Sequence, residues 1–202
     1  MRTGTPYWLA GAAYAASRAV GSRWVRDVAK PLVVPLLADA VVALPRRDRA
    51  PAAVGLTGGW IGDLLLLRKD RLRPAAAAFA LNHAAYLALL HRRGARFRPG
   101  PVALRAVPLA AAAVLGGRER LGLVLTYGGF VGATSALASD PALRGSGAAA
   151  GGNLFLLSDS LILVRTVALP GDTPAARAVD TAVAVTYVAA QRLLMSALAW
   201  RT

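Results

Sequence analysis

The chain has 202 residues, 56% of them hydrophobic and 17% charged, and its mean hydropathy is +0.48. It has no cysteine and only two histidines, which excludes disulfides, thiolate catalysis and a histidine-rich metal centre, so we expect no metal and no other cofactor. The net charge of +14 comes largely from Lys and Arg in short connectors between apolar blocks. Because such clusters are typical of anchors at lipid head groups, we expect no nucleic-acid partner.

The apolar blocks predict an all-α, polytopic integral membrane bundle of about eight transmembrane helices, because a helix that crosses the hydrocarbon core needs about 20 mostly apolar residues. In chain order the predicted spans are residues 7–22, 31–44, 51–67, 74–90, 101–116, 119–139, 147–169 and 174–200. Their connectors leave no room for a soluble domain, so we expect a single transmembrane domain over residues 1–202. The high Ala and Arg usage is typical of a GC-rich bacterial genome, and we expect a multi-pass protein of a bacterial cell membrane.

Two aspartates lie inside these apolar segments. Asp63 is followed by four leucines, and Asp159 lies between the apolar residues 154–157 and 161–162. A carboxylate at the bilayer centre costs about 2.5–3.5 kcal/mol on insertion scales, and such a group normally faces the bundle interior or a watery cavity. We therefore expect a functional role for both. For Asp39 and Asp180 we expect structural roles.

Four arginines also fall within the predicted spans. They are Arg18, Arg105, Arg165 and Arg192. Buried ion pairs with the aspartates would hold helices in register, and for Arg18 and Arg105 we expect such pairs or snorkelling to the membrane surface.

Glycines at small-xxx-small spacing occur in the third span, from Gly55 to Gly59 and from Gly58 to Gly62. Such spacings let helix backbones approach closely. The seventh span is also glycine-rich. We therefore expect the third and seventh helices to approach each other and to bring Asp63 and Asp159 together.

Further polar residues share helix faces with one another. His83 and Tyr86 are spaced i, i+3, and Tyr187 and Gln191 are spaced i, i+4. The residues alone leave two chemistries open: transport of protons or cations through a relay of acids, and hydrolysis by two carboxyls acting as general acid and base. We found neither an internal repeat nor a clearly broken helix, which disfavours a transporter.

Five motifs, in order from the second predicted span to the last, resemble the YhhN/TMEM86 family of membrane lysoplasmalogenases. They are Lys30-Pro31 with Pro35 and Leu36, Gly62-Asp63 followed by leucines, Phe79-x-x-x-His83-x-x-Tyr86, Leu154-Phe155-x-x-Ser158-Asp159, and Tyr187-x-x-Ala190-Gln191. The resemblance implies a bundle of about eight helices that needs no metal. It also implies hydrolysis of the vinyl-ether bond of a lysoplasmalogen, which releases a fatty aldehyde and a glycerophospho-base.

Vinyl-ether cleavage requires an acid that protonates an alkene carbon and a carboxylate that stabilises the resulting oxocarbenium ion and takes a proton from water, as in glycosidases. On the resemblance we assign this pair to Asp63 and Asp159, without choosing which is the acid. We expect supporting or substrate-binding roles for Lys30, His83, Tyr86, Asn153, Ser158, Tyr187 and Gln191. Lys30, with Arg192 as a weaker candidate, is assigned to the phosphate of the lysophospholipid. The expected partners are this lipid and the bilayer.

Overall fold

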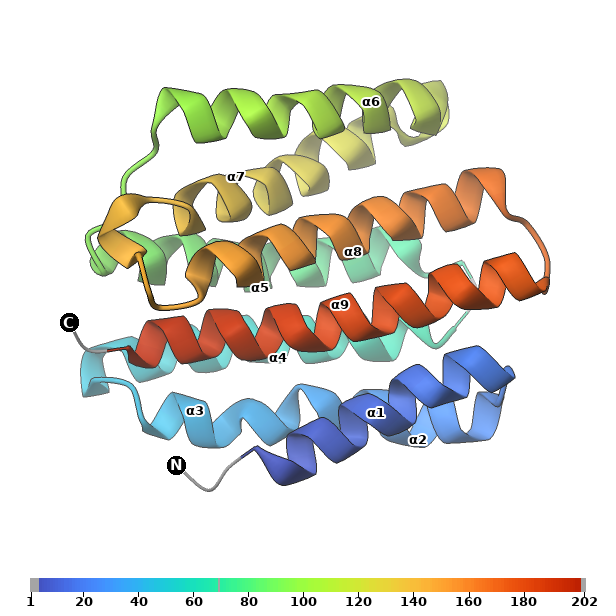
Figure 1. Ribbon diagram of the computed structural model, residues 1–202, viewed down its shortest axis with the longest axis horizontal. Helices are drawn as coiled ribbons and strands as arrows, with labels where there is room; N and C mark the ends of the chain where they lie inside the picture. Colours follow the sequence, from blue (N-terminus) through green and yellow to red (C-terminus); the bar gives the residue numbers. More distant parts are fainter. Residues whose placement is uncertain (1–3, 69, 201–202) are drawn as a thin grey trace.

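The computed structural model describes residues 4–68 and 70–200 of the chain, and these residues are helical with no strand. The elements are α1 (Thr5–Val20), α2 (Arg23–Val33), a 3₁₀ turn (Pro35–Leu37), α3 (Ala38–Val42), α4 (Arg46–Leu66), α5 (Leu72–Arg92), α6 (Pro99–Leu123), a π-helical stretch (Val124–Gly128), α7 (Gly129–Ala138), a second 3₁₀ turn (Pro141–Leu143), α8 (Ala148–Ala168) and α9 (Pro174–Ala199). The helices lie side by side along one direction, and α1 begins at the same end of the molecule at which α9 ends (Figure 1).

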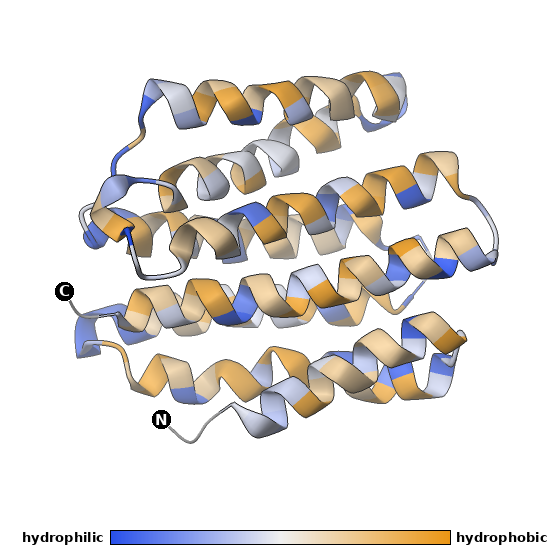
Figure 2. Cartoon of the chain, viewed as in Figure 1, coloured by the Kyte–Doolittle hydropathy of each residue, from blue (hydrophilic) through white to orange (hydrophobic). Residues whose placement is uncertain are grey.

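The expectation of an all-α fold is confirmed for the described residues, and each of the eight predicted spans is helical over most of its length. Among the described residues, three stretches are long and apolar enough to cross a membrane: Pro99–Ala138, Ala148–Ala168 and Pro174–Ala199. The other helices are shorter or less apolar, so the number of eight crossings stays a prediction. Apolar positions nevertheless run along all the helices, with polar positions between them (Figure 2).

The helices are less regular than the sequence suggested. The second predicted span is broken, since α2 ends at Val33 and a 3₁₀ turn separates it from α3. Pro35 begins this turn, and proline stops a helix because it lacks an N–H and its ring clashes with the preceding turn. A second irregularity is Gly117 in α6, where φ is +65° and ψ is −179°. The expectation that no helix is clearly broken was therefore wrong.

The glycine-rich faces pack against other partners than we expected. A Cβ at Gly55 would lie 2.5 Å from the Cβ of Ala85, and one at Gly62 would lie 2.7 Å from the ring of Phe79, so this face of α4 packs on α5. In α8, a Cβ at Gly151 would meet α9 and one at Gly152 would meet α7. Direct glycine packing of the third span on the seventh was thus a wrong prediction, because the spacing identifies a close face but not its partner.

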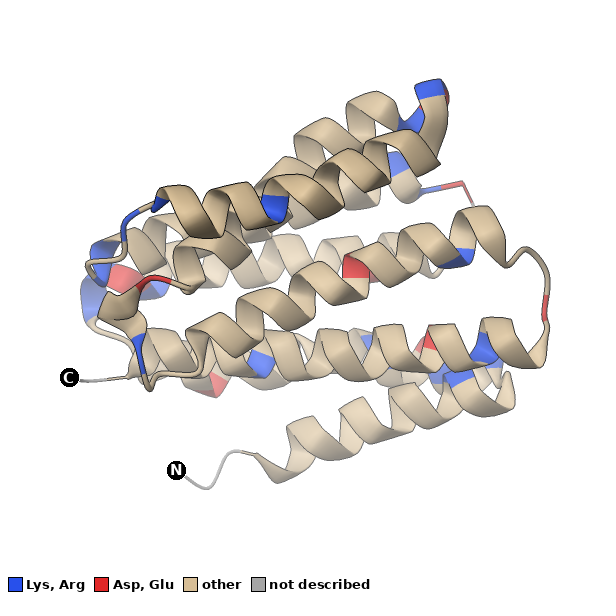
Figure 3. Cartoon of the chain, turned by 45° about the horizontal axis from the view of Figure 1, so that its top comes forward, with Lys and Arg blue, Asp and Glu red and all other residues tan. Residues whose placement is uncertain are grey.

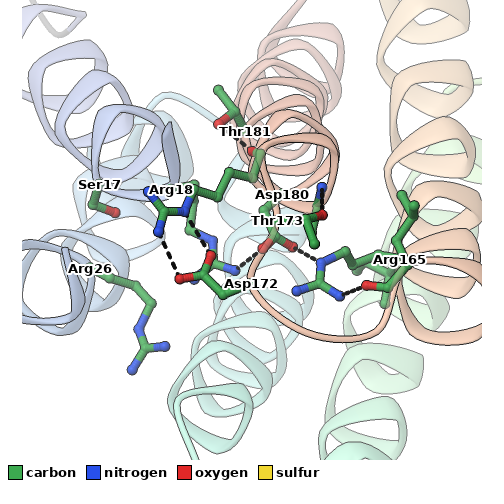
Figure 4. A network of polar contacts seen from close by, with 12 residues as sticks. Ser17, Arg18, Arg26, Arg165, Asp172, Thr173, Asp180 and Thr181 are labelled. Carbon is green, nitrogen blue, oxygen red and sulfur yellow. Dashed lines mark hydrogen bonds and ion pairs between the residues drawn. The ribbon is translucent and has the colours of Figure 1, made fainter. Parts of the chain in front are cut away.

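Most Lys and Arg residues lie near the two ends of the helices (Figure 3). At one end, the carboxylate of Asp180 in α9 lies between Arg18 of α1, at 2.6 Å, and Arg165 of α8, at 3.2 Å (Figure 4). These two ion pairs link α9 to α1 and α8, which agrees with the structural role expected for Asp180. Arg105 of α6 instead contacts uncharged groups, donating hydrogen bonds to the side chains of Ser135, Ser139 and Asn153.

Candidate active site

The carboxyl of Asp63 lies three residues before the end of α4 and is almost completely buried, with 1% of its surface exposed. The Tyr187 hydroxyl of α9 donates a hydrogen bond of 2.7 Å to its Oδ2 atom. Lys30 Nζ, from α2, lies 3.4 Å from its Oδ1 atom and 5.5 Å from the centre of the Tyr14 ring in α1. The cation and the hydroxyl donor both favour the charged form of this carboxyl, which burial by itself disfavours.

A chain of side-chain hydrogen bonds runs behind Asp63. Gln191, one turn after Tyr187 in α9, donates from Nε2 to the Tyr187 hydroxyl (3.1 Å). The Tyr86 hydroxyl of α5 donates to Oε1 of Gln191 (2.5 Å). Tyr86 and Gln191 are both buried, so the chain fixes the direction in which the Tyr187 hydroxyl points.

Asp159 in α8 has a different environment. The Tyr127 hydroxyl, from the π-helical stretch, donates a 2.8 Å hydrogen bond to its Oδ2 atom. Within residues 4–68 and 70–200, no Lys or Arg forms an ion pair with this carboxyl, and its Oδ1 atom has no hydrogen-bond partner. One oxygen of Asp159 is therefore oriented by a tyrosine, while the other is left for a ligand or a proton.

The two aspartates line one small polar chamber of about 30 Å³. Its other polar walls come from Lys30, Tyr14, Ser158 and Tyr187, and its apolar walls include Phe155. A buried water needs about 10–15 Å³ of such space and two to four polar partners, so the chamber has room for about two waters. Asp63 and Asp159 thus line the same chamber, although the glycines of α4 and α8 pack on other helices and not on each other.

A larger cavity of about 130 Å³ adjoins this chamber between α5, α6 and α8. Its walls are mostly apolar, with Leu109, Val131 and Leu163 among them, and Arg105 and Arg120 of α6 are its two cationic residues. The cavity and the chamber share part of their lining: Leu66, Phe79, Asp159 and Ile162. Asp159 is therefore the carboxyl that borders both the polar chamber and the apolar cavity.

His83 lies fully buried in α5, behind this site. Its ring packs on Phe155, with centroids 4.4 Å apart, and on Tyr127 at 5.9 Å. The Thr134 hydroxyl donates to the Phe130 carbonyl, so it accepts from Nδ1–H of His83 (3.1 Å), and Nε2 then carries the lone pair. Nε2 has no partner among the described residues. His83 thus supports the aromatic wall and contacts neither aspartate.

The structure brings together most of the residues that the sequence selected. Lys30, Asp63, Ser158, Asp159 and Tyr187 line the chamber, while Tyr86 and Gln191 stand behind Tyr187. Asn153 lies apart, because its Oδ1 atom accepts hydrogen bonds from Arg105 and Ser135. Arg192 lines neither of the two cavities.

Sequence reasoning missed two partners in the site. Tyr14 faces Lys30 from α1, and Thr134 fixes the tautomer of His83 from α7. Both lie in ordinary helical sequence without a motif. No role was assigned to Tyr127 from the sequence either. It contacts Asp159 from the π-helical stretch, and such stretches are frequent at functional sites.

These features define the class: a helical membrane protein in which a buried carboxyl, Asp63, and a half-buried one, Asp159, lie where a polar chamber meets an apolar cavity. The model of the YhhN family matches residues 25–198, and the chain belongs to this family, which includes the TMEM86 lysoplasmalogenases. The resemblance inferred from the five motifs is thereby confirmed, and α1 lies outside the matched range. A search of curated proteins and a search of solved structures each found no match.

Proposed function

We propose that this protein hydrolyses the vinyl-ether bond of lysoplasmalogens, or of closely related vinyl-ether lipids, inside the membrane. The proposal rests on membership of the YhhN family and on one observation: Asp159 borders both a chamber of the size of two waters and a cavity suited to a hydrocarbon chain. The enzyme would then be an ether hydrolase with eight crossings of a bacterial cell membrane. The products are a fatty aldehyde and glycerophosphoethanolamine or glycerophosphocholine.

The contacts support different roles for the two aspartates. Asp63 has Lys30 and the Tyr187 hydroxyl beside it, which favours the carboxylate and hence the base. Asp159 has only the Tyr127 hydroxyl and apolar walls, which favours the protonated form and hence the acid. The environment separates two chemically identical groups, as it does in other enzymes that use paired carboxyls.

The reaction begins with transfer of the Asp159 proton to the alkene carbon that is not bonded to oxygen. The neighbouring carbon becomes part of an oxocarbenium ion, which the two carboxylates stabilise. A water from the chamber adds to that carbon and gives a proton to Asp63, forming a hemiacetal. Asp159 then takes the hemiacetal hydroxyl proton while Asp63 returns its proton to the leaving glycerol oxygen. The C–O bond breaks, and both aspartates regain their starting states.

Lys30 has a role in this scheme that differs from phosphate binding. Its ammonium contacts Asp63 within the chamber, and Lys30 does not line the apolar cavity. We propose that Lys30 maintains the charge of Asp63. Tyr187, Gln191 and Tyr86 then hold the same carboxylate in one orientation, and Ser158 contributes a polar wall.

The test is release of aldehyde from a lysoplasmenyl phospholipid by the purified protein in detergent or nanodiscs, measured with a coupled alcohol dehydrogenase. The matched substrate is the 1-acyl lysophospholipid of the same chain length, from which no aldehyde can form. We expect turnover of the vinyl-ether lipid only. A transporter that uses the same aspartates as a proton relay would show ion-dependent uptake in liposomes without aldehyde, and that outcome would refute the proposal.

A further inference from the structure

The apolar cavity has a cation near each of its ends, and the two cations differ in their contacts. Arg105 donates four hydrogen bonds, to the side chains of Ser135, Ser139 and Asn153 and to the backbone carbonyl of Pro101. A guanidinium has five N–H groups, so Arg105 is nearly saturated. Arg120 lines the same cavity, yet within the described part of the chain it has neither a hydrogen-bond acceptor nor an ion-pair partner.

The height of Arg120 along the bundle can be compared with that of Asp159. A Cβ at Gly116 would lie 3.3 Å from the Cβ of Arg120 and 4.0 Å from a methyl of Leu163. Leu163 is four residues after Asp159 in α8, which is a rise of about 6 Å towards the end of that helix. Arg120 therefore lies roughly one helical turn beyond Asp159, on the side of the α8–α9 connection.

This offset matches the chemistry of a single-chain phospholipid. In such a lipid, the three-carbon glycerol backbone separates the ether oxygen from the phosphate, a distance comparable with one helical turn of about 5.4 Å. Arg is also the residue whose planar fork of donors suits a phosphate. The exposed Arg118 and Glu119 on the same stretch of α6 do not line the cavity, so Arg120 is the cation there that a ligand inside the cavity can reach.

We propose that Arg120 binds the phosphate of a single-chain ether phospholipid whose hydrocarbon chain extends through the apolar cavity towards Arg105. This assignment rests on the proposed function for the position of the ether bond at Asp159. It moves the phosphate from Lys30, which is in contact with Asp63, to a residue without a partner among those described. It also fixes the direction of the lipid, with its head group at the end of the bundle where α8 ends.

The experiment measures binding rather than turnover, so that it does not depend on hydrolysis. The probes are 1-O-hexadecyl-glycero-3-phosphoethanolamine, which has a saturated ether, and 1-O-hexadecylglycerol, which has the same chain without phosphate. Their Kd values are measured on the purified protein in nanodiscs for the wild type, Arg120→Gln, Arg120→Lys and Arg105→Gln. The control is Arg118→Gln, which removes a neighbouring exposed cation, and thermal midpoints show whether each variant is folded.

We expect Arg120→Gln to weaken binding of the phospholipid about tenfold, because one charge-assisted hydrogen bond is lost. The Kd of hexadecylglycerol should stay unchanged. Arg120→Lys should recover part of the loss, and Arg118→Gln should match the wild type. Equal Kd values for wild type and Arg120→Gln would overturn the assignment, as would equal weakening of both probes or a phosphate-specific loss in Arg105→Gln instead. Phosphate-specific binding through Arg120 without aldehyde release would refute only the proposed reaction.

Discussion

Asp180 and Asp159 both lie inside long helices with high mean hydropathy, yet they differ in their cationic partners and in whether a cavity adjoins them. Asp180 lies between Arg18 and Arg165, near the end of the bundle, and its side chain is 16% exposed (Figure 4). Asp159 has no cationic partner among the described residues, one tyrosine donor, and an apolar cavity on one side. Two arginines hold a carboxylate in place and neutralise it, whereas a carboxyl without a cation beside a cavity remains free to exchange a proton with a ligand.

Asp63 lies between these two cases. It has one cation, Lys30, and one hydroxyl donor, Tyr187, but it also borders the chamber that can hold water. We therefore propose a structural role for Asp180, the role of general acid for Asp159 and that of general base for Asp63. The following variants test whether the number of cationic partners does separate these roles.

The largest effect is expected for Asp159→Asn. The amide keeps the shape and can still contact Tyr127, but it cannot donate a proton to carbon. We expect kcat for aldehyde release to fall by roughly 10²–10⁴-fold, the usual contribution of a general acid, with little change in the thermal midpoint. Steady-state kinetics in nanodiscs measure kcat, and a thermal melt measures the midpoint. Turnover near the wild-type rate would remove Asp159 from the mechanism.

Asp63→Asn should follow, with a fall in kcat of about 10²-fold. We also expect Asp63→Asn to lower the stability of the protein, because Lys30 is then left buried without an anion. The double variant Asp63→Asn with Lys30→Met removes both charges and should recover stability without recovering turnover. If the double variant is active, Asp63 acts only as the partner of Lys30.

Lys30→Gln is expected to have an intermediate effect, about tenfold on kcat, with KM nearly unchanged. The reason is that Lys30 contacts Asp63 rather than the apolar cavity. Kinetics over a range of lysoplasmenyl lipid concentrations separate the two constants. A rise in KM alone would restore the role in phosphate binding that the sequence suggested.

The smallest effect on activity is expected for Asp180→Asn. This change leaves Arg18 and Arg165 without their shared carboxylate, and we expect a loss of about 1–3 kcal/mol in stability. The kcat of the folded protein should stay within about twofold of the wild type, since Asp180 contacts neither cavity. A loss of turnover in folded Asp180→Asn as large as that in Asp159→Asn would contradict the comparison.

The fold and the two central acids could be predicted because both follow from local sequence. Apolar blocks of sufficient length predict helices, and an aspartate among leucines is costly enough to indicate a buried site. The partners of those helices were harder to predict. The glycines of α4 identify a close face, yet nothing in their spacing says that Ala85 and Phe79 of α5 cover it.

The supporting residues show the same limit. Lys30 was assigned to the phosphate on the family resemblance, and only the packing of α2 against α4 shows that it contacts Asp63. Asn153 is six residues before Asp159, which on an α-helix is about 120° around the axis, so it faces Arg105 instead of the chamber. Helix geometry alone could have corrected that assignment, whereas Tyr14 and Thr134 required the tertiary structure.

The central claim, proton transfer from Asp159 to an alkene carbon, is tested most directly by hydrolysis in D₂O. The Asp159 carboxyl exchanges its proton with solvent, so each turnover should place one deuterium on the carbon next to the aldehyde. Reduction of the aldehyde to an alcohol as it forms prevents later exchange, and mass spectrometry then counts the deuterium, with authentic undeuterated aldehyde as the control. One deuterium per aldehyde with the wild type, and no product with Asp159→Asn, is the predicted result. Aldehyde without deuterium, or deuterated aldehyde from Asp159→Asn at the wild-type rate, would contradict it.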